Sequence, residues 1–105
     1  MSDDASGPFW SAAEGVLQDE DVQKGTMMGF PCLRLHGRFF ASCERRTGDL
    51  IVKLPAEHVQ ELIDANEATV FAPNGRTFRE WALITGRDPE RWRQLISEAR
   101  AFAAI

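Results

Sequence analysis

The stretch from Phe30 to Glu44 constrains the fold more than any other part of the sequence. It holds two apolar runs, Phe30 to Leu35 and Arg38 to Glu44, on either side of His36-Gly37. Glycine supplies the positive φ that a two-residue hairpin turn requires, so these runs predict an antiparallel hairpin. A second turn at residues 45–48 leads into Asp49 to Leu54, which predicts a further strand of the same sheet.

Alternation of side chains across this sheet predicts which residues share a face. Pairing Leu35 with Arg38 places Cys32 opposite Ala41, and Cys43 opposite either Leu50 or Val52. The face expected to form the core carries Phe30, Cys32, Phe39, Ala41, Cys43, Leu50, Val52 and Leu54. The other face is a mixed surface, and the residues that we interpret as a candidate interaction surface on it are Leu33, Arg38, Phe40, Ile51 and Lys53. The alternative is that part of the N-terminal segment covers this face.

The rest of the chain reads as helices and two more strands. Gly7-Pro8 predicts a helix that ends by Asp21, since proline favours the first helical position. Further along, the pattern predicts a short extended piece near Met27 and a helix from Pro55 to about Ala65. Two strands, Thr69–Ala72 and Phe78–Thr85, are expected on either side of a turn at Pro73-Asn74-Gly75. A last helix begins at Asp88-Pro89, and its apolar stripe consists of Trp92, Leu95, Ile96 and Ala99.

This element order, α-β-β-β-α-β-β-α, predicts an α+β two-layer sandwich with an antiparallel sheet of about five strands. The extended piece near Met27 allows one more short strand. A chain of 105 residues buries roughly 65% of its surface on folding, enough for one core. We therefore expect a single domain over residues 1–105, with residues 1–6 forming a flexible acidic leader.

The distribution of charge limits the partners. The net charge of −4 divides into −5 over residues 1–24 and +1 over residues 25–105. Non-specific binding of nucleic acid depends on clustered cations, so the charge does not favour a nucleic-acid partner. No apolar run is long enough to span a membrane, and the acidic N-terminus does not resemble a signal peptide. These features predict a cytoplasmic protein with no membrane partner.

The side chains that could ligate a soft metal are Cys32, Cys43, His36 and His58. On an extended strand Cys32 and His36 stand roughly 13 Å apart, too far to share one Zn²⁺ ion. Both cysteines face the expected core, where they act as small hydrophobic side chains rather than nucleophiles. We therefore predict no metal site, and a cysteine-dependent activity is the only enzymatic alternative that these residues leave open.

Other catalytic patterns point the same way. Glu57, Glu61 and Asp64 share one helix face, and we interpret them as solvated rather than as acid–base groups. No nucleotide-binding loop and no nucleophile or metalloprotease motif occurs in the sequence. The sequence therefore predicts no catalytic residues and no cofactor.

Four arginines are the candidate contacts to nucleic acid. Arg76 and Arg79 flank the turn before the last strand, and Arg93 and Arg100 share a face of the last helix. Acidic residues are interleaved with them, so surface ion pairing is the alternative.

Three short motifs stand in a familiar order: Gly25-Thr26-Met27-Met28-Gly29, Gly37-Arg38-Phe39-Phe40-Ala41 and Leu50-Ile51-Val52-Lys53. With Phe71-x-Pro73, Trp81 and the alanine-rich C-terminal helix, the chain resembles the TfoX N-terminal-domain and YjbR (MmcQ-like) group of small bacterial proteins over roughly residues 9–103. The resemblance implies a secretion-chaperone-like α+β fold, with an antiparallel sheet backed by helices.

The functional implication of the resemblance is broad. TfoX-type proteins are linked to the regulation of natural competence, YjbR-like proteins are commonly labelled DNA-binding, and the group brings no catalytic residues to this chain. Together with the mixed sheet face, this predicts a non-enzymatic regulatory or adaptor domain that binds a protein partner or a second copy of itself. The alternative is a DNA-binding protein or competence-type regulator.

Overall fold

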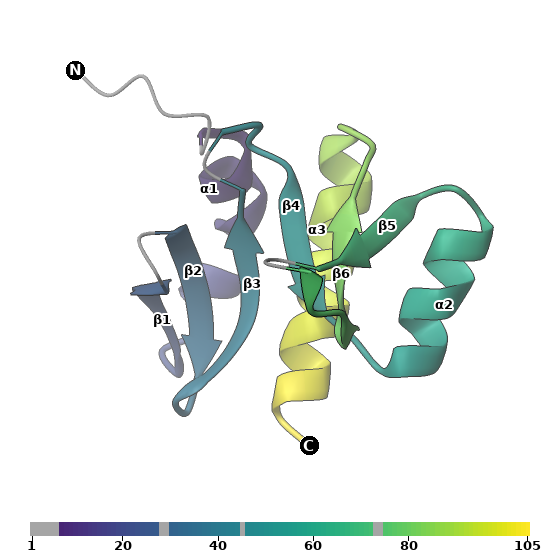
Figure 1. The fold of residues 1–105 in the computed structure, drawn as a ribbon. Helices are drawn as coiled ribbons and strands as arrows, with labels where there is room; N and C mark the ends of the chain where they lie inside the picture. The colour runs from purple at the N-terminus through teal and green to yellow at the C-terminus, as the bar shows by residue number, and fades with distance from the viewer. Residues whose placement is uncertain (1–6, 28–29, 45, 73–74) are drawn as a thin grey trace.

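The computed structural model describes residues 7–27, 30–44, 46–72 and 75–105. These residues form an antiparallel sheet and helices that pack on it, which confirms the predicted two-layer α+β sandwich (Figure 1). The elements, in chain order, are helix α1 (Gly7–Ala13), the 3₁₀ helix η1 (Val16–Gln18), strands β1 (Val22–Met27), β2 (Phe30–Leu35), β3 (Arg38–Cys43) and β4 (Leu50–Lys53), helix α2 (Ala56–Asp64), strands β5 (Ala68–Phe71) and β6 (Phe78–Ile84), and helix α3 (Pro89–Ala103).

The strands of the described ranges form one six-stranded sheet in the order β1-β2-β3-β4-β6-β5. This is one strand more than the five or so that the sequence predicts. The additional strand is β1, which pairs with β2 from Val22 opposite Leu35 to Met27 opposite Phe30. It begins earlier than the one further short strand near Met27 that the sequence allows. The two edges of the sheet are therefore β1 and β5.

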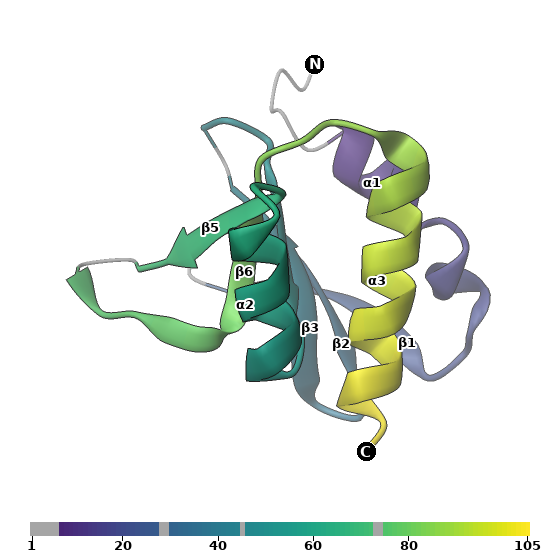
Figure 2. The ribbon, with the colours of Figure 1, turned by 90° about the vertical axis from the view of Figure 1, so that its right-hand side faces the viewer.

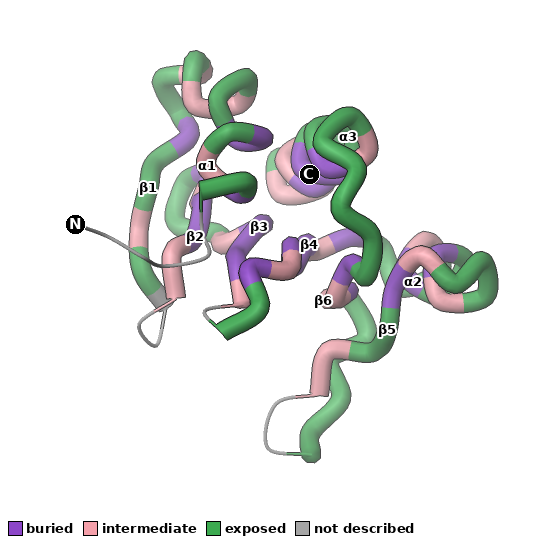
Figure 3. The backbone as a smooth tube through the Cα atoms, turned by 90° about the horizontal axis from the view of Figure 1, so that it is seen from above, coloured by how far each residue is buried: buried purple, intermediate pink, exposed green. Residues whose placement is uncertain are grey.

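The helices lie on one side of the sheet and at one of its edges (Figures 2 and 3). Helix α3 crosses β3 and β4, and α1 packs against α3. Helix α2 contacts β5 and β6. In the described part of the chain no helix covers the opposite face of the sheet, which we call the open face (Figure 3).

The N-terminal helix is shorter than predicted. Helix α1 ends at Ala13, and a separate 3₁₀ turn, η1, follows before β1 begins at Val22. Gly15 explains the early end, since glycine in a helix interior costs about 1 kcal/mol relative to alanine. The acidic leader and the turn residues Pro73-Asn74 lie outside the described residues.

The turn of the central hairpin and the start of α3 agree with the sequence prediction. His36 and Gly37 both have positive φ, 52° and 83°, as a two-residue type I′ turn requires. At α3, the Asp88 side chain accepts a hydrogen bond of 3.0 Å from the backbone N–H of Glu90, and Pro89 occupies the first turn. Asp88 is therefore the N-cap that the sequence indicates.

A β-bulge overturns the predicted register between β2 and β3. Leu35 pairs with Arg38 as expected, but Leu33 pairs with Ala41 and Arg34 with Phe39, so Phe40 has no partner on β2. The extra residue shifts every pair beyond it by one position. Cys32 consequently pairs with Ser42 instead of Ala41. The pairing of Cys43 with Leu50, one of the two predicted alternatives, is confirmed.

The bulge also changes which residues share a face. One row of paired residues faces the helices and consists of Lys24, Leu33, Ala41, Val52, Ala82 and Val70. The next row faces the open side and consists of Gly25, Cys32, Ser42, Ile51, Leu83 and Thr69. The predicted core face is therefore correct for Ala41, Cys43, Leu50, Val52 and Leu54 and wrong for Phe30, Cys32 and Phe39. Leu33 and Phe40 take core positions instead, and both are fully buried.

Candidate binding groove beside helix α2

The five residues of the predicted interaction surface do not form one surface. Leu33 and Phe40 are fully buried in the core, and Ile51 is 2% exposed on the opposite face of the sheet. Arg38 donates hydrogen bonds to the carbonyls of Ala103 and Ile105, at 3.4 and 2.7 Å, and so caps the end of α3. Lys53 is half-buried on the open face. The prediction of this surface is wrong because it assumed a hairpin without the bulge.

The four candidate arginines lie in two separate places. Arg93 pairs with Glu90 and Arg100 with Asp19, so on α3 the ion-pair interpretation is confirmed. Arg76 lies over the Phe78 ring, 5.5 Å from its centroid, and Arg79 projects from β6. The β5–β6 hairpin extends from the sheet on the side away from α3 (Figure 2). The four side chains therefore form no common cationic patch.

The two cysteines are buried on opposite faces of the sheet. Cys43 belongs to the core cluster, whereas Cys32 lies in the row of the open face. Burial raises the pKa of the Cys32 thiol, and Arg34 offsets part of this rise. Among the residues that the structure describes, no group of three or more His, Cys, Asp or Glu side chains could hold a metal ion.

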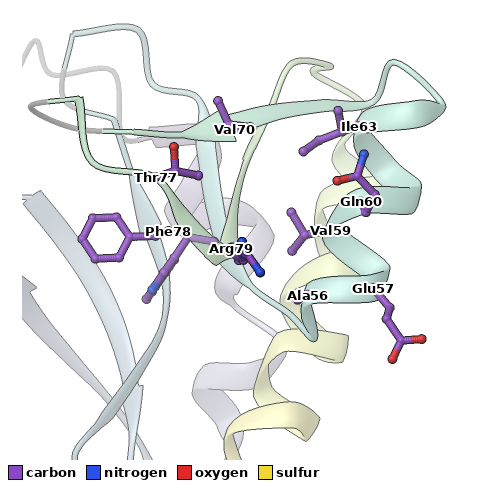
Figure 4. Close-up of a pocket in the computed structure, with 10 residues that line it drawn as sticks. Ala56, Glu57, Val59, Gln60, Ile63, Val70, Thr77, Phe78 and Arg79 are labelled. Carbon is purple, nitrogen blue, oxygen red and sulfur yellow. The ribbon is translucent and has the colours of Figure 1, made fainter.

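Helix α2 and the β5–β6 hairpin enclose an open groove of about 470 Å³. Figure 4 shows that Val59 and Ile63 of α2 point toward the hairpin, while the Phe78 ring points away from α2. The lining residues are Ala56, Glu57, Val59, Gln60, Ile63, Val70, Thr77, Phe78, Arg79 and Trp81. Most of these side chains are apolar, so the groove suits a partner that offers apolar surface.

Local sequence explains why the groove stays open. Val70 follows the face alternation of β5 and points to the helix side, where it pairs with Ala82. Helix α2 ends at Asp64, however, and buries only Val59 and Leu62 fully. Val70 is therefore 52% exposed, and Phe78 on the opposite strand is 37% exposed. They are two of the three large apolar side chains that stand exposed in the described part of the chain.

Charged residues stand on both sides of the groove. Helix α2 contains Glu57, Glu61 and Asp64 and no lysine or arginine. On the strand side Arg79 lines the groove, and the acidic residue Glu80 follows it on β6. In the described part of the chain neither Glu57 nor Arg79 belongs to an ion pair. Both charges are thus available to a partner.

The open face has a different character. Its partly buried side chains include Phe39 and Trp81 together with Arg34 and Lys53. Phe71 lies beside Trp81, with 6.3 Å between the ring centroids, and beside Phe78, with 6.1 Å. No paired position on this face of the described strands holds an acidic residue.

Comparison of the chain with protein-family models, with curated proteins and with solved structures finds no match in any of the three. The fold and the groove therefore define this protein only as an α+β two-layer domain with an apolar binding groove. No helix among its described residues is both long and apolar enough to cross a bilayer.

The groove is not predicted by the sequence. The predicted strands at Thr69–Ala72 and Phe78–Thr85 lie at nearly the observed positions of β5 and β6. The one available signal was the pair of apolar residues Val70 and Phe78 beside the turn. That signal does not distinguish a buried hairpin from an exposed one, because exposure depends on where α2 ends relative to the strands.

Proposed function

We propose that this protein is a non-enzymatic binding domain that recognises another protein through the groove between α2 and the β5–β6 hairpin. The observation that carries this proposal is the exposure of Val70, which is 52% exposed on the helix side of β5 at the groove. Fully burying a side chain of this kind stabilises by about 1.5–3 kcal/mol relative to leaving it in water. A partner that covers Val70 in the groove gains free energy of this kind.

The chemistry of the groove favours protein over nucleic acid as the partner. Its lining is mostly apolar, and Arg79 is the one cation among the residues that line it. A phosphate backbone requires several cations in register, whereas an apolar centre with a few charges at the rim is typical of a protein interface.

The wider role that we propose is that of a cytoplasmic regulatory or adaptor domain of the TfoX and YjbR type. The residue motifs from Gly25 to Lys53 support the family, and the low cysteine content supports the compartment. Burial of both cysteines supports a role without covalent catalysis.

Photo-crosslinking tests the proposed function. A photoreactive amino acid replaces Val70, and a matched protein carries it at Thr69, which is exposed on the opposite face of the same strand. In cell extract we expect the chain with the probe at position 70 to form an adduct with another protein. An excess of wild-type chain without the probe should abolish this adduct, whereas an excess of the Val70→Asp chain should not. The Thr69 probe should give no such adduct. Absence of a competed adduct from Val70 contradicts the proposal.

The open face favours one second candidate, the binding of single-stranded nucleic acid. Aromatic side chains on which bases stack, combined with cations, are typical of such surfaces. Here Phe39, Phe71 and Trp81 accompany Arg34 and Lys53 without an acidic residue at a paired strand position.

A salt titration tests this second candidate. Binding of a labelled oligonucleotide should weaken steeply as salt rises, and Trp81→Ala should weaken it at constant salt. Lack of binding to single-stranded or duplex DNA at about 50 mM salt contradicts a nucleic-acid function, since phosphate contacts are strongest at low salt.

A further inference from the structure

We infer that two copies of this chain form a dimer through strand β1, which pairs antiparallel with β1 of the second copy about a two-fold axis at Gly25. The contact lies at the edge of the sheet opposite to β5 and the groove, so it goes beyond the proposed function and does not depend on it. Its basis is a row of backbone groups on β1 that no described segment pairs.

The backbone groups of β1 point alternately toward β2 and away from it, as in any antiparallel pair. The N–H of Val22 donates to the carbonyl of Asp19, at 3.0 Å, so it does not face β2. Lys24 and Thr26, two and four positions on, therefore also direct their N–H and C=O groups out of the sheet. Pro31, which is opposite Thr26 and has no N–H, fits this alternation. In the described part of the chain no hydrogen bond reaches these outward groups.

Strand β1 lacks the features that usually protect an exposed edge. Natural edge strands are often very short, or they carry a proline, a β-bulge or a free lysine. Strand β1 has six residues and no proline, and its pairing with β2 runs without a shift. The ammonium of Lys24 lies 5.2 Å from the centroid of the Trp10 ring, which holds it on the helix side of the sheet. No described helix or strand lies beyond β1 (Figure 3). This edge is therefore open to another strand.

The sequence of β1 complements itself in one antiparallel register. With the two-fold axis at Gly25, Lys24 of each copy lies opposite Thr26 of the other, and each of these pairs exchanges two backbone hydrogen bonds. No acid occurs in β1, and this register sets no lysine opposite a lysine, which would be unfavourable. At the axis itself Gly25 faces Gly25, so no side chain separates the strands.

Charge next to the strand favours the antiparallel direction. Residues 1–24 carry a net charge of −5, and Asp21 directly precedes β1. In the antiparallel register the Asp21 residues of the two copies are roughly 26 Å apart along the strands, well beyond the Debye length. A parallel pair would set the two acidic segments side by side.

The contact closes on itself. A two-fold axis covers the β1 edges of both copies at once, whereas a foreign strand covers only one. The edges that remain are β5, which has only four residues and contacts α2. We therefore expect a dimer rather than a fibre. An edge contact is small as interfaces go, so this dimer should dissociate on dilution.

A proline substitution tests the role of the outward N–H. Thr26→Pro removes this N–H and leaves the hydrogen bonds between β1 and β2 in place, because the group does not face β2. Thr26→Val keeps the N–H and is the matched control. In sedimentation, wild type and Thr26→Val should rise from 11.8 kDa toward twice that mass as the concentration increases. Thr26→Pro should stay at the monomer mass, and circular dichroism verifies that it is folded.

A cysteine at the axis tests the register. An added Cβ at Gly25 meets Phe39 and Arg34 at ordinary contact distances, 3.8 and 3.9 Å, so Gly25→Cys fits the fold. Its thiol should form a disulfide with the second copy in oxidised glutathione, because facing residues of this kind have Cα atoms about 4.5 Å apart. Gln23→Cys lies on the same face of β1, but its two copies are roughly 13 Å apart along the strands. It should not crosslink.

Three results would overturn the dimer. One is a wild type that stays at 11.8 kDa up to about 1 mM, the weak end of the affinity scale. Another is a Thr26→Pro variant that dimerises like wild type. The third is a Gly25→Cys variant that crosslinks no faster than Gln23→Cys, and this comparison decides alone if Thr26→Pro is unfolded. None of them bears on the groove, whose test is the crosslink at Val70.

Discussion

At the residue scale, one carboxylate joins two segments that lie 81 positions apart in the chain. Asp19 accepts a hydrogen bond of 2.9 Å from the backbone N–H of Asp21, and it also pairs with Arg100 of α3. The backbone N–H and the guanidinium both favour the charged carboxylate, so they lower the pKa of Asp19 below its ordinary value of 3.8. The end of η1 is thereby fixed against α3.

This arrangement predicts the pH dependence of one variant. A pKa that is lower in the folded state adds stability above the unfolded pKa, and this stability is lost as the pH falls through the folded pKa. Asp19→Asn should therefore unfold more easily than wild type at pH 7. The difference should shrink as the pH falls below about 4. Urea denaturation at a series of pH values measures it. A difference that stays constant down to pH 2 contradicts the role of the charge.

The buried thiols give a second prediction at this scale. Cys32 and Cys43 are both 0% exposed, and burial raises the pKa of Cys32. A thiol reagent that needs an accessible thiolate should react with neither residue in the native protein and with both in denaturant. Absorbance after addition of an aromatic disulfide reports the number of reactive thiols. Rapid labelling of the native protein would revive the cysteine-dependent activity that the sequence left open.

At the element scale, the bulge in β3 decides which aromatic residue stabilises the core. A regular hairpin that keeps Ala41 and Cys43 on the helix side places Phe39 on that side as well and Phe40 on the open face. With the bulge, Phe40 is 0% exposed in the core, and Phe39 is half-buried on the open face beside Arg34. One inserted residue exchanges their roles, because side chains alternate with a period of two.

The two phenylalanines can therefore be compared directly. Phe40→Ala should lower the free energy of unfolding by about 3–5 kcal/mol, the usual cost of removing a buried phenylalanine. Phe39→Ala should cost clearly less, since its ring retains contact with water. Denaturant midpoints for the two variants measure the difference. The opposite ranking would indicate a hairpin without the bulge.

At the scale of the whole molecule, a single cluster of buried residues includes side chains from every helix from α1 to α3 and from every strand from β1 to β6. Trp92 occupies this cluster at 2% exposure and donates from its indole N–H to the carbonyl of Gly86, at 2.9 Å. Trp10 packs against the same cluster from the N-terminal side. A shared core of this kind couples the elements into one unit.

Unfolding should accordingly be cooperative. Tryptophan fluorescence, which reports Trp10, Trp81 and Trp92, and far-ultraviolet circular dichroism should give the same midpoint in urea. Two separate transitions would contradict the expectation of a single domain over residues 1–105.

Local chemistry controls the features that could be predicted from the amino-acid sequence. The hairpin about His36-Gly37, the Asp88 cap of α3 and the α+β class depend on turn conformations, on a side chain that caps a nearby backbone and on patterns within single elements. Tertiary structure decided the bulge at Phe40, the faces occupied by Leu33 and Cys32, and the exposure of Val70. These features depend on pairing between strands and on where α2 ends, and neither is encoded in any single segment. The interaction surface predicted from a regular hairpin was therefore wrong, and the groove beside α2 emerged only when the elements were assembled.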